Sequence, residues 1–198
     1  MTDLKIILAS GSPRRAEILR NIGVNFEVRP TDAEETVDPE LSPSQVVCEL
    51  AFRKASAAVA LLSEREKSSL VLTADTIVEL NGRILGKPKD EEDARCMLEQ
   101  LSGRVHSVYT GYSLSKDGFY YTEHVKTDVE FLKLTDDLIY RYIKTGEPKD
   151  KAGAYGIQGY GSALVRGIRG DYFNVMGLPV SALVMTARTQ FDVDLLGY

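Results

Sequence analysis

The spacing of hydrophobic residues changes along the chain, and each spacing predicts a different kind of element. Short, β-branched apolar runs at 5–9 and 70–74 are typical of strands buried on both faces. Apolar residues three and four apart favour helices with one buried face. The helices predicted from this spacing or from their caps cover 13–21, 43–62, 91–101, 136–144 and 179–190. No internal repeat or low-complexity linker separates these segments.

Asp75 directly follows the apolar run at 70–74. If that run is a central strand, Asp75 stands at its carboxyl end. In open α/β sheets this edge is where ligands bind, so a carboxylate placed there is a candidate site residue. The alternative is local, because aspartate often ends a strand simply by forming a turn.

The stretch SGSPRR follows the first expected strand and opens a helix. Ser12 suits the N-cap position, and Pro13 suits the first helical position. The N-terminus of a helix presents free backbone N–H groups and the positive end of the helix dipole. Arg14 and Arg15 add positive charge where it is otherwise unfavourable. We therefore expect a bound phosphate here, rather than a solvated surface.

Carboxylates also gather after a second expected strand at 25–29, in the stretch DAEE that ends at Glu35. One interpretation is a solvated acidic loop, and the other is a set of oxygen ligands for a hard divalent cation. Lys54 lies close to the apolar face of the helix at 43–62. Such a lysine usually extends its head to water, yet it could also reach a phosphate.

Asn81 and Gly82 form the strongest short hairpin signal in the chain. The hairpin is expected to bring Lys87 back toward Asp75. Further along, alternating apolar and polar residues predict a long antiparallel pair of strands with one wet face. The strands expected from these patterns cover 76–80, 83–85, 106–114, 120–134 and 163–168.

The second dense signal is the stretch EPKDKAGAYGIQGYG at 147–161. It shows neither helical nor strand spacing, so we expect a long loop, and ordered glycine-rich loops of this length tend to be functional. Lys149 and Lys151 supply cations, while the Gln158 amide can read a base edge through its donor and acceptor groups. The alternative is a loop that is merely flexible.

Composition limits the classes of function. The net charge of −5 makes general binding to nucleic acid polymers or membranes unfavourable. Cys48 and Cys96 fall within helical apolar patterns, so we expect reduced core residues rather than a disulfide or zinc site. His106 and His124 lie in strand patterns without a nearby nucleophile. With no leader or membrane-spanning run, the sequence predicts a soluble, cytoplasmic protein that folds as one unit.

Six segments in order, LASGSPRR, LTADTIV, GKP, LSGRVHSVYTG, GEPKDKAGAYGIQG and NVMGLP, resemble the Maf family of nucleoside triphosphate pyrophosphatases. They span residues 8–179. The resemblance implies an α/β fold shared with the inosine triphosphate pyrophosphatase group. It further implies an elongated mixed sheet flanked by helices, a cleft between two lobes of a single domain at 1–198, and often a homodimer.

The implied reaction is hydrolysis of a nucleoside triphosphate to the monophosphate and pyrophosphate with Mg²⁺ or Mn²⁺. The family's general base falls on Asp75, and its substrate-discriminating residues fall on Arg14, Thr76 and Gln158, in the pattern of the dTTP and UTP subgroup. The metal is assigned to Asp75 and Glu35, with Glu34 adjacent. The phosphate-binding set implied by the family and the helix start is Ser10, Ser12, Arg14, Arg15, Lys54, Lys87 and Lys151.

Two other functions are compatible with the same residues. A nucleotide-binding regulator of septum formation would use the same site with little hydrolysis, although a pure sensor has no need of a base such as Asp75. Within the enzyme class, the runner-up is a pyrophosphatase that removes modified nucleotides.

Overall fold

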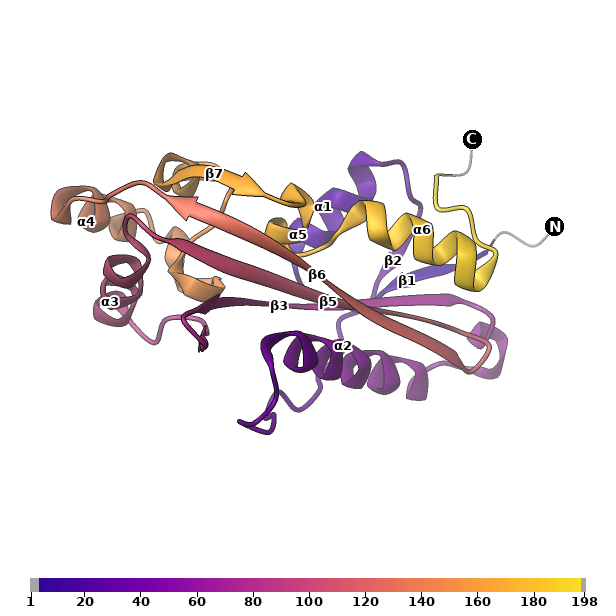
Figure 1. The fold of residues 1–198 in the computed structure, drawn as a ribbon. Coiled ribbons are helices and arrows are strands. Elements are labelled where there is room, and N and C mark those ends of the chain that lie inside the picture. The colour runs from indigo at the N-terminus through magenta and orange to yellow at the C-terminus, as the bar shows by residue number, and fades with distance from the viewer. Residues whose placement is uncertain (1–3, 197–198) are drawn as a thin grey trace. The chain divides into compact units, whose positions relative to one another are not determined.

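Among residues 4–196, which the computed structural model describes, seven strands join in one mixed sheet (Figure 1). The strand order is β2-β1-β3-β5-β6-β7, and β4 pairs with β3 outside this path. Helices accompany the strands, which confirms the α/β class. The strands are β1 Ile6–Leu8, β2 Glu27–Val28, β3 Leu70–Leu80, β4 Arg83–Leu85, β5 Val105–Lys116, β6 Phe119–Phe131 and β7 Val165–Arg169.

The chain divides into two compact units. Unit 1 consists of the described residues of Met1–Asp75, Thr110–Val125 and Gly177–Tyr198, and unit 2 consists of Thr76–Tyr109 and Lys126–Met176. The boundary crosses β3, β5 and β6, and in β3 it lies directly after Asp75. The expected single domain with a cleft between two lobes stays a prediction.

Unit 1 contains the parallel part of the sheet. β1 pairs in parallel with β2 and with β3, where Leu8 lies opposite Leu72. The helices are α1 Pro13–Asn21, α2 Pro43–Ala60 and α6 Val180–Phe191. α2 begins where the sequence predicts, because Ser42 and Gln45 form a capping box. Its buried face consists of Val46, Val47, Leu50, Ala51, Ala55 and Ala58.

The predicted end of the central strand at Asp75 is wrong. β3 continues through Asp75 and Thr76, both half-buried, to Leu80. The strand extends because it gains a new partner in antiparallel β4. Val78 of β3 pairs with Leu85 of β4. The parallel pairing with β1 nevertheless reaches only Leu72. Asp75 therefore lies past the end of β1, although it is in the middle of its own strand.

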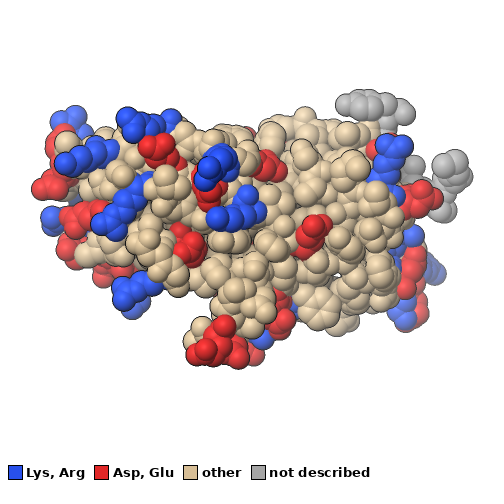
Figure 2. Space-filling view, viewed as in Figure 1, with Lys and Arg blue, Asp and Glu red and all other residues tan. Residues whose placement is uncertain are grey.

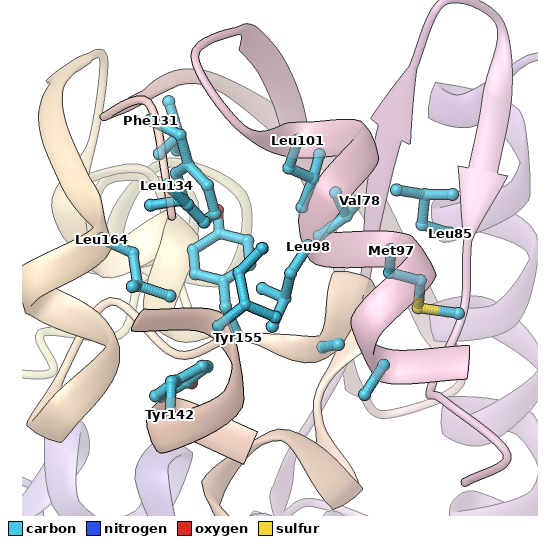
Figure 3. Packing of buried hydrophobic residues seen from close by; sticks show 14 of the residues in the cluster. Val78, Leu85, Met97, Leu98, Leu101, Phe131, Leu134, Tyr142, Tyr155 and Leu164 are labelled. Carbon is cyan, nitrogen blue, oxygen red and sulfur yellow. The ribbon is translucent and has the colours of Figure 1, made fainter. Parts of the chain in front are cut away.

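Unit 2 packs helices α3 Glu91–Leu101, α4 Asp136–Lys144 and α5 Tyr172–Met176 with strand residues around an apolar cluster (Figure 3). α3 and α4 start where the sequence predicts, because Asp90 and Thr135 cap them through side-chain hydrogen bonds. The Asn81-Gly82 turn also forms as predicted, with both residues at positive φ. The buried cluster includes Leu98, Leu101, Val129, Phe131, Ile139, Tyr155 and Leu164.

The stretch at 147–161 is not irregular, contrary to the prediction. It folds into 3₁₀ helices at Glu147–Asp150 and Ala152–Ala154, and a further one starts at Gly159 and ends at Leu164. Turns this short leave no periodic hydrophobic pattern in the sequence. The five-residue helix α5, Tyr172–Met176, is likewise too short to leave such a pattern. Gly153 and Gly159 adopt positive φ, which allows the chain to reverse between these turns.

The cysteines are free, but the prediction that both are core residues is wrong. Cys48 is half-buried in α2, whereas Cys96 is exposed on α3. On the face shown in Figure 2, lysine and arginine side chains are interspersed with aspartate and glutamate and form no single basic surface. No helix within residues 4–196 has both the length and the apolar character needed to span a membrane.

The buried histidine of unit 2 links the sheet to the glycine-rich stretch. His106 is 2% exposed, and its Nε2 lies 2.7 Å from the hydroxyl of Tyr155. Its ring also makes an edge contact with Phe131. Burial lowers the pKa of His106 to about 4, even though the nearby charge of Asp128 opposes this shift. The folded protein therefore favours the neutral imidazole.

Stability is expected to fall as the pH drops from 6.5 to 4. The unfolded chain binds a proton at His106 near pH 6.5, whereas the folded chain resists protonation until about pH 4. This difference amounts to a loss on the order of 3 kcal/mol. Urea unfolding across this pH range should show a flatter profile for His106→Gln than for the wild type. Replacing the exposed His124 with glutamine is the control, and an equal flattening there would contradict the assignment.

Candidate functional site

Lys54 joins the two carboxylates that the sequence singles out. Its Nζ donates to Asp75 Oδ1 at 2.6 Å and to Glu35 Oε1 at 3.0 Å. The side chains of Lys54 and Asp75 are 15% and 14% exposed, whereas that of Glu35 is 65% exposed. The cluster is therefore a cation held between one sheltered and one solvated carboxylate.

The fold fixes this cluster through the contact between α2 and β3. Thr73 is fully buried, and its hydroxyl donates to the backbone oxygen of Ala51 at 2.7 Å. Ala51 lies nearly one turn before Lys54, and Thr73 lies two residues before Asp75 on the same face of the strand. The lysine is consequently directed at the carboxylate by buried backbone, rather than by a mobile surface arrangement.

Electrostatics keep this lysine charged. Burial lowers the pKa of Lys54, but attraction and hydrogen bonding to Asp75, assisted by Glu35, outweigh burial and raise it. The ammonium group in turn holds the Asp75 carboxylate by opposite charge and by the 2.6 Å hydrogen bond. The cluster thus combines a negative group able to accept a proton with a cation able to bind an anion.

Arg15 organises the start of α1. Its Nε donates to the backbone oxygen of Gly177 at 2.8 Å, and its Nη1 donates to Ser10 Oγ at 3.0 Å. Burial of the guanidinium lowers the pKa of Arg15, while the negative charge of Asp75 acts against this. A guanidinium remains protonated at any physiological pH. Arg15 therefore places a fixed positive charge within electrostatic reach of Asp75.

The serines before α1 differ from their predicted roles in detail. Ser10 is buried, and its hydroxyl oxygen accepts from Arg15 and from the backbone N–H of Ser12 at 3.3 Å. Ser12 occupies the N-cap position, but its side chain makes no capping hydrogen bond. Arg14 is half-buried in the first turn of α1. Through these two hydrogen bonds Ser10 holds Arg15 and the turn before α1 in place.

The other predicted site residues belong to unit 2. Thr76 follows Asp75 in β3, Lys87 is exposed after β4, and Gln158 is half-buried immediately before Gly159. Lys151 is already engaged, because its Nζ donates to the backbone oxygen of Glu147 and to Asp150 Oδ1, each at 2.7 Å. The convergence of these residues with the Lys54 cluster stays a prediction.

Two features of unit 2 are not predicted from the sequence. Glu147 accepts hydrogen bonds from Tyr142, Tyr160 and Gly161. The sequence signal for this role is an acidic residue at the start of the glycine-rich stretch. A pocket of about 300 Å³ also opens beside the start of α3. Lys149, one of the two cations singled out in the sequence, lines it. The other lining residues are Pro88, Lys89, Asp90, Glu91, Ala94, Ile143 and Pro148.

Comparison with known sequences gives matches along almost the whole chain. The sequence model of the family described as Maf-like protein matches residues 5–190. A protein named dTTP/UTP pyrophosphatase from Thermoanaerobacter sp. (strain X514) is 48% identical over 195 residues, covering 98% of this chain and 100% of the relative. A protein of the same name from Bacillus cereus is 49% identical over 190 residues, covering 96% of this chain and 97% of the relative.

Comparison with solved structures supports the fold. The structure of the Staphylococcus aureus Ham1 protein matches with a TM-score of 0.50 and covers 81% of this chain and 79% of its own. The two sequences are 20% identical, so this likeness concerns the fold alone. It agrees with the mixed α/β arrangement of strands and helices described above.

Proposed function

The chain belongs to the Maf-like protein family, and from this premise we propose that it hydrolyses dTTP and UTP to the monophosphate and pyrophosphate. The relatives that are nearly half identical over their full length support this substrate class. The structural observation that carries the proposal is the contact of Lys54 with Asp75 and Glu35. A base, a cation and a second carboxylate form a suitable group for attack on a phosphate.

The cations of the chain are proposed to bind the triphosphate. In unit 1 these are Arg14, Arg15 and Lys54, with the backbone and hydroxyls of Ser10 and Ser12 at the start of α1. In unit 2, Lys87 is exposed and available, whereas Lys151 would exchange its bond to Asp150 for a phosphate oxygen. Thr76 and Gln158 are proposed, with Arg14, to discriminate between bases.

A divalent cation fits the carboxylates of the cluster. Asp75 and Glu35 each place an oxygen within hydrogen-bond distance of the same ammonium nitrogen, so both reach one cationic centre. Within residues 4–196 no group of three or more His, Cys, Asp or Glu side chains could hold a metal. Mg²⁺ commonly uses one or two carboxylates and completes its shell with water and substrate phosphates. Bound there, Mg²⁺ or Mn²⁺ would neutralise phosphate charge and polarise the phosphorus.

The proposed chemistry requires a water molecule beside Asp75. Asp75 accepts a proton from that water, whose oxygen attacks the α-phosphorus. A bond forms between the water oxygen and the α-phosphorus while the bond to the bridging oxygen breaks. Pyrophosphate leaves with the bridging oxygen, and Arg15 and Lys54 offset the negative charge that develops on it. Lys54 also holds the Asp75 carboxylate in place before attack.

Product analysis with a panel of nucleotides tests the proposal. Purified protein with Mg²⁺ or Mn²⁺ is expected to release monophosphate and pyrophosphate fastest from dTTP and UTP. CTP, ATP, GTP and 7-methyl-GTP should react at least about tenfold more slowly, because a site built to bond a base edge rejects others strongly. Chelation by EDTA should stop turnover. Tight nucleotide binding without turnover would instead favour the regulator of septum formation. The homodimer stays a prediction that the molar mass in solution would test.

A further inference from the structure

The Glu147 carboxylate is a hydrogen-bonding centre inside the glycine-rich stretch. Its Oε1 accepts from the hydroxyl of Tyr142 at 2.9 Å and from the backbone N–H of Gly161 at 3.0 Å. Its Oε2 accepts from the backbone N–H of Tyr160 at 2.9 Å. All three donors belong to unit 2, as Glu147 itself does. One half-buried side chain therefore holds the chain immediately after Gln158.

The same carboxylate also reaches the chain before Gln158 through Tyr142. The buried Tyr142 hydroxyl accepts from the backbone N–H of Gly156 at 3.1 Å while it donates to Glu147. Burial raises the pKa of Tyr142, so the hydroxyl keeps the proton that this donation needs. Gln158 consequently lies between two backbone segments that depend on one carboxylate. Glu147 bonds Tyr160 and Gly161 directly, and it reaches Gly156 through the Tyr142 hydroxyl.

The glycines of this stretch are explained by close approach to these groups. A Cβ at Gly159 would lie 2.6 Å from Glu147 Oε2, in a backbone conformation with φ of +64°. A Cβ at Gly161 would lie 2.1 Å from the backbone oxygen of Gly156 and 2.8 Å from the Tyr142 hydroxyl. These positions exclude side chains because the backbone closes around the carboxylate. The glycine content therefore indicates tight packing rather than flexibility.

We propose that Glu147 is a positioning residue that sets the base preference of the enzyme by fixing the backbone on both sides of Gln158. The inference rests on the proposed function, because that function assigns base recognition to Gln158. Both oxygens of Glu147 accept from N–H or O–H donors. In Glu147→Gln, an NH₂ group replaces one of these oxygens. Because each oxygen faces a backbone N–H, two donors then meet and at least one hydrogen bond is lost. In this proposal the carboxylate acts only through the backbone that carries Gln158.

Amide hydrogen exchange tests the structural half of the proposal without relying on activity. In Glu147→Gln, the amide of Tyr160 or of Gly161, whichever faces the new NH₂ group, is expected to exchange at least about tenfold faster, because its hydrogen bond to a charged acceptor is lost. The matched control is Glu91→Gln, which breaks an exposed ion pair with Lys144 in the same unit. Exchange in the control should remain as in the wild type. Unchanged exchange in Glu147→Gln would overturn the positioning role.

Kinetics test the functional half. The ratio of kcat/KM for dTTP to that for dATP is expected to fall at least about tenfold in Glu147→Gln and in Gln158→Ala. The double variant should lose little more than either single variant, because both changes disable the same base contact. Additive losses, or an unchanged ratio alongside faster exchange, would overturn the link to base preference.

Two further measurements keep the outcomes separate. If Glu147→Gln fails to fold, Tyr142→Phe removes the hydroxyl bridge to Gly156 and should lower the same ratio to a smaller extent; an unchanged ratio would count against the proposal. If the wild type turns over no triphosphate, the proposed function fails, while hydrogen exchange still decides whether Glu147 holds the backbone around Gln158.

Discussion

Replacing Asp75 with asparagine is expected to slow dTTP hydrolysis by about 10²- to 10⁴-fold, the range that a general base contributes. The amide keeps the size of the side chain but cannot accept the proton of the attacking water. It can still accept a hydrogen bond from Lys54, whose Nζ lies 2.6 Å from Asp75 Oδ1. Lys54 also retains its contact with Glu35, so a stability loss of only about 1–3 kcal/mol is expected.

The measurement is kcat under saturating dTTP, with circular dichroism and thermal unfolding recorded on the same samples. Asp117→Asn is a matched control, because Asp117 lies in the β5–β6 turn at positive φ, where asparagine is well tolerated. Asp117 also forms an exposed ion pair with Lys116. Asp117→Asn therefore tests the effect of removing one carboxylate charge from an ion pair outside the site. An Asp75→Asn variant with near wild-type kcat would leave Asp75 only a binding role.

Local signals were sufficient for most element boundaries. Pro13, Asp90 and Thr135 start their helices as predicted because N-terminal signals are read by backbone groups within one turn. The Asn81-Gly82 hairpin is similarly local, since positive φ at both positions determines the turn. None of these features depends on distant parts of the chain, which is why the sequence alone predicts them.

Features that depend on distant partners could not be predicted. Asp75 looks like a strand end, but β3 continues because β4 returns to pair with it. Lys54 was placed near the apolar face of its helix by spacing, whereas its bond to Asp75 depends on how closely α2 approaches the sheet. In each case a tertiary contact determines what a local pattern leaves open.

The approach of α2 to the sheet leads to the largest expected effect on stability. Gly111 of β5 is buried under α2, and a Cβ at this position would lie 2.2 Å from the backbone oxygen of Val47. It would also lie 2.8 Å from the backbone nitrogen of Cys48. Backbone atoms cannot move aside as a flexible side chain can. Gly111→Ala is therefore expected to destabilise the fold by about 3 kcal/mol or more.

Urea unfolding of Gly111→Ala beside Gly167→Ala isolates this contact. Gly167 lies in β7 at negative φ, and no heavy atom lies within 4 Å of a Cβ added there. Alanine at this position should therefore be neutral or stabilise by up to about 1 kcal/mol.

Helix α2, which approaches the sheet closely at Gly111, also carries Lys54, two turns after Val47 on the same face. Residual folded Gly111→Ala should consequently bind nucleotide more weakly, because α2 must shift and carry Lys54 away from Asp75. Equal stability of the two alanine variants would show that α2 can shift without cost, and that its close approach does not hold the lysine in place.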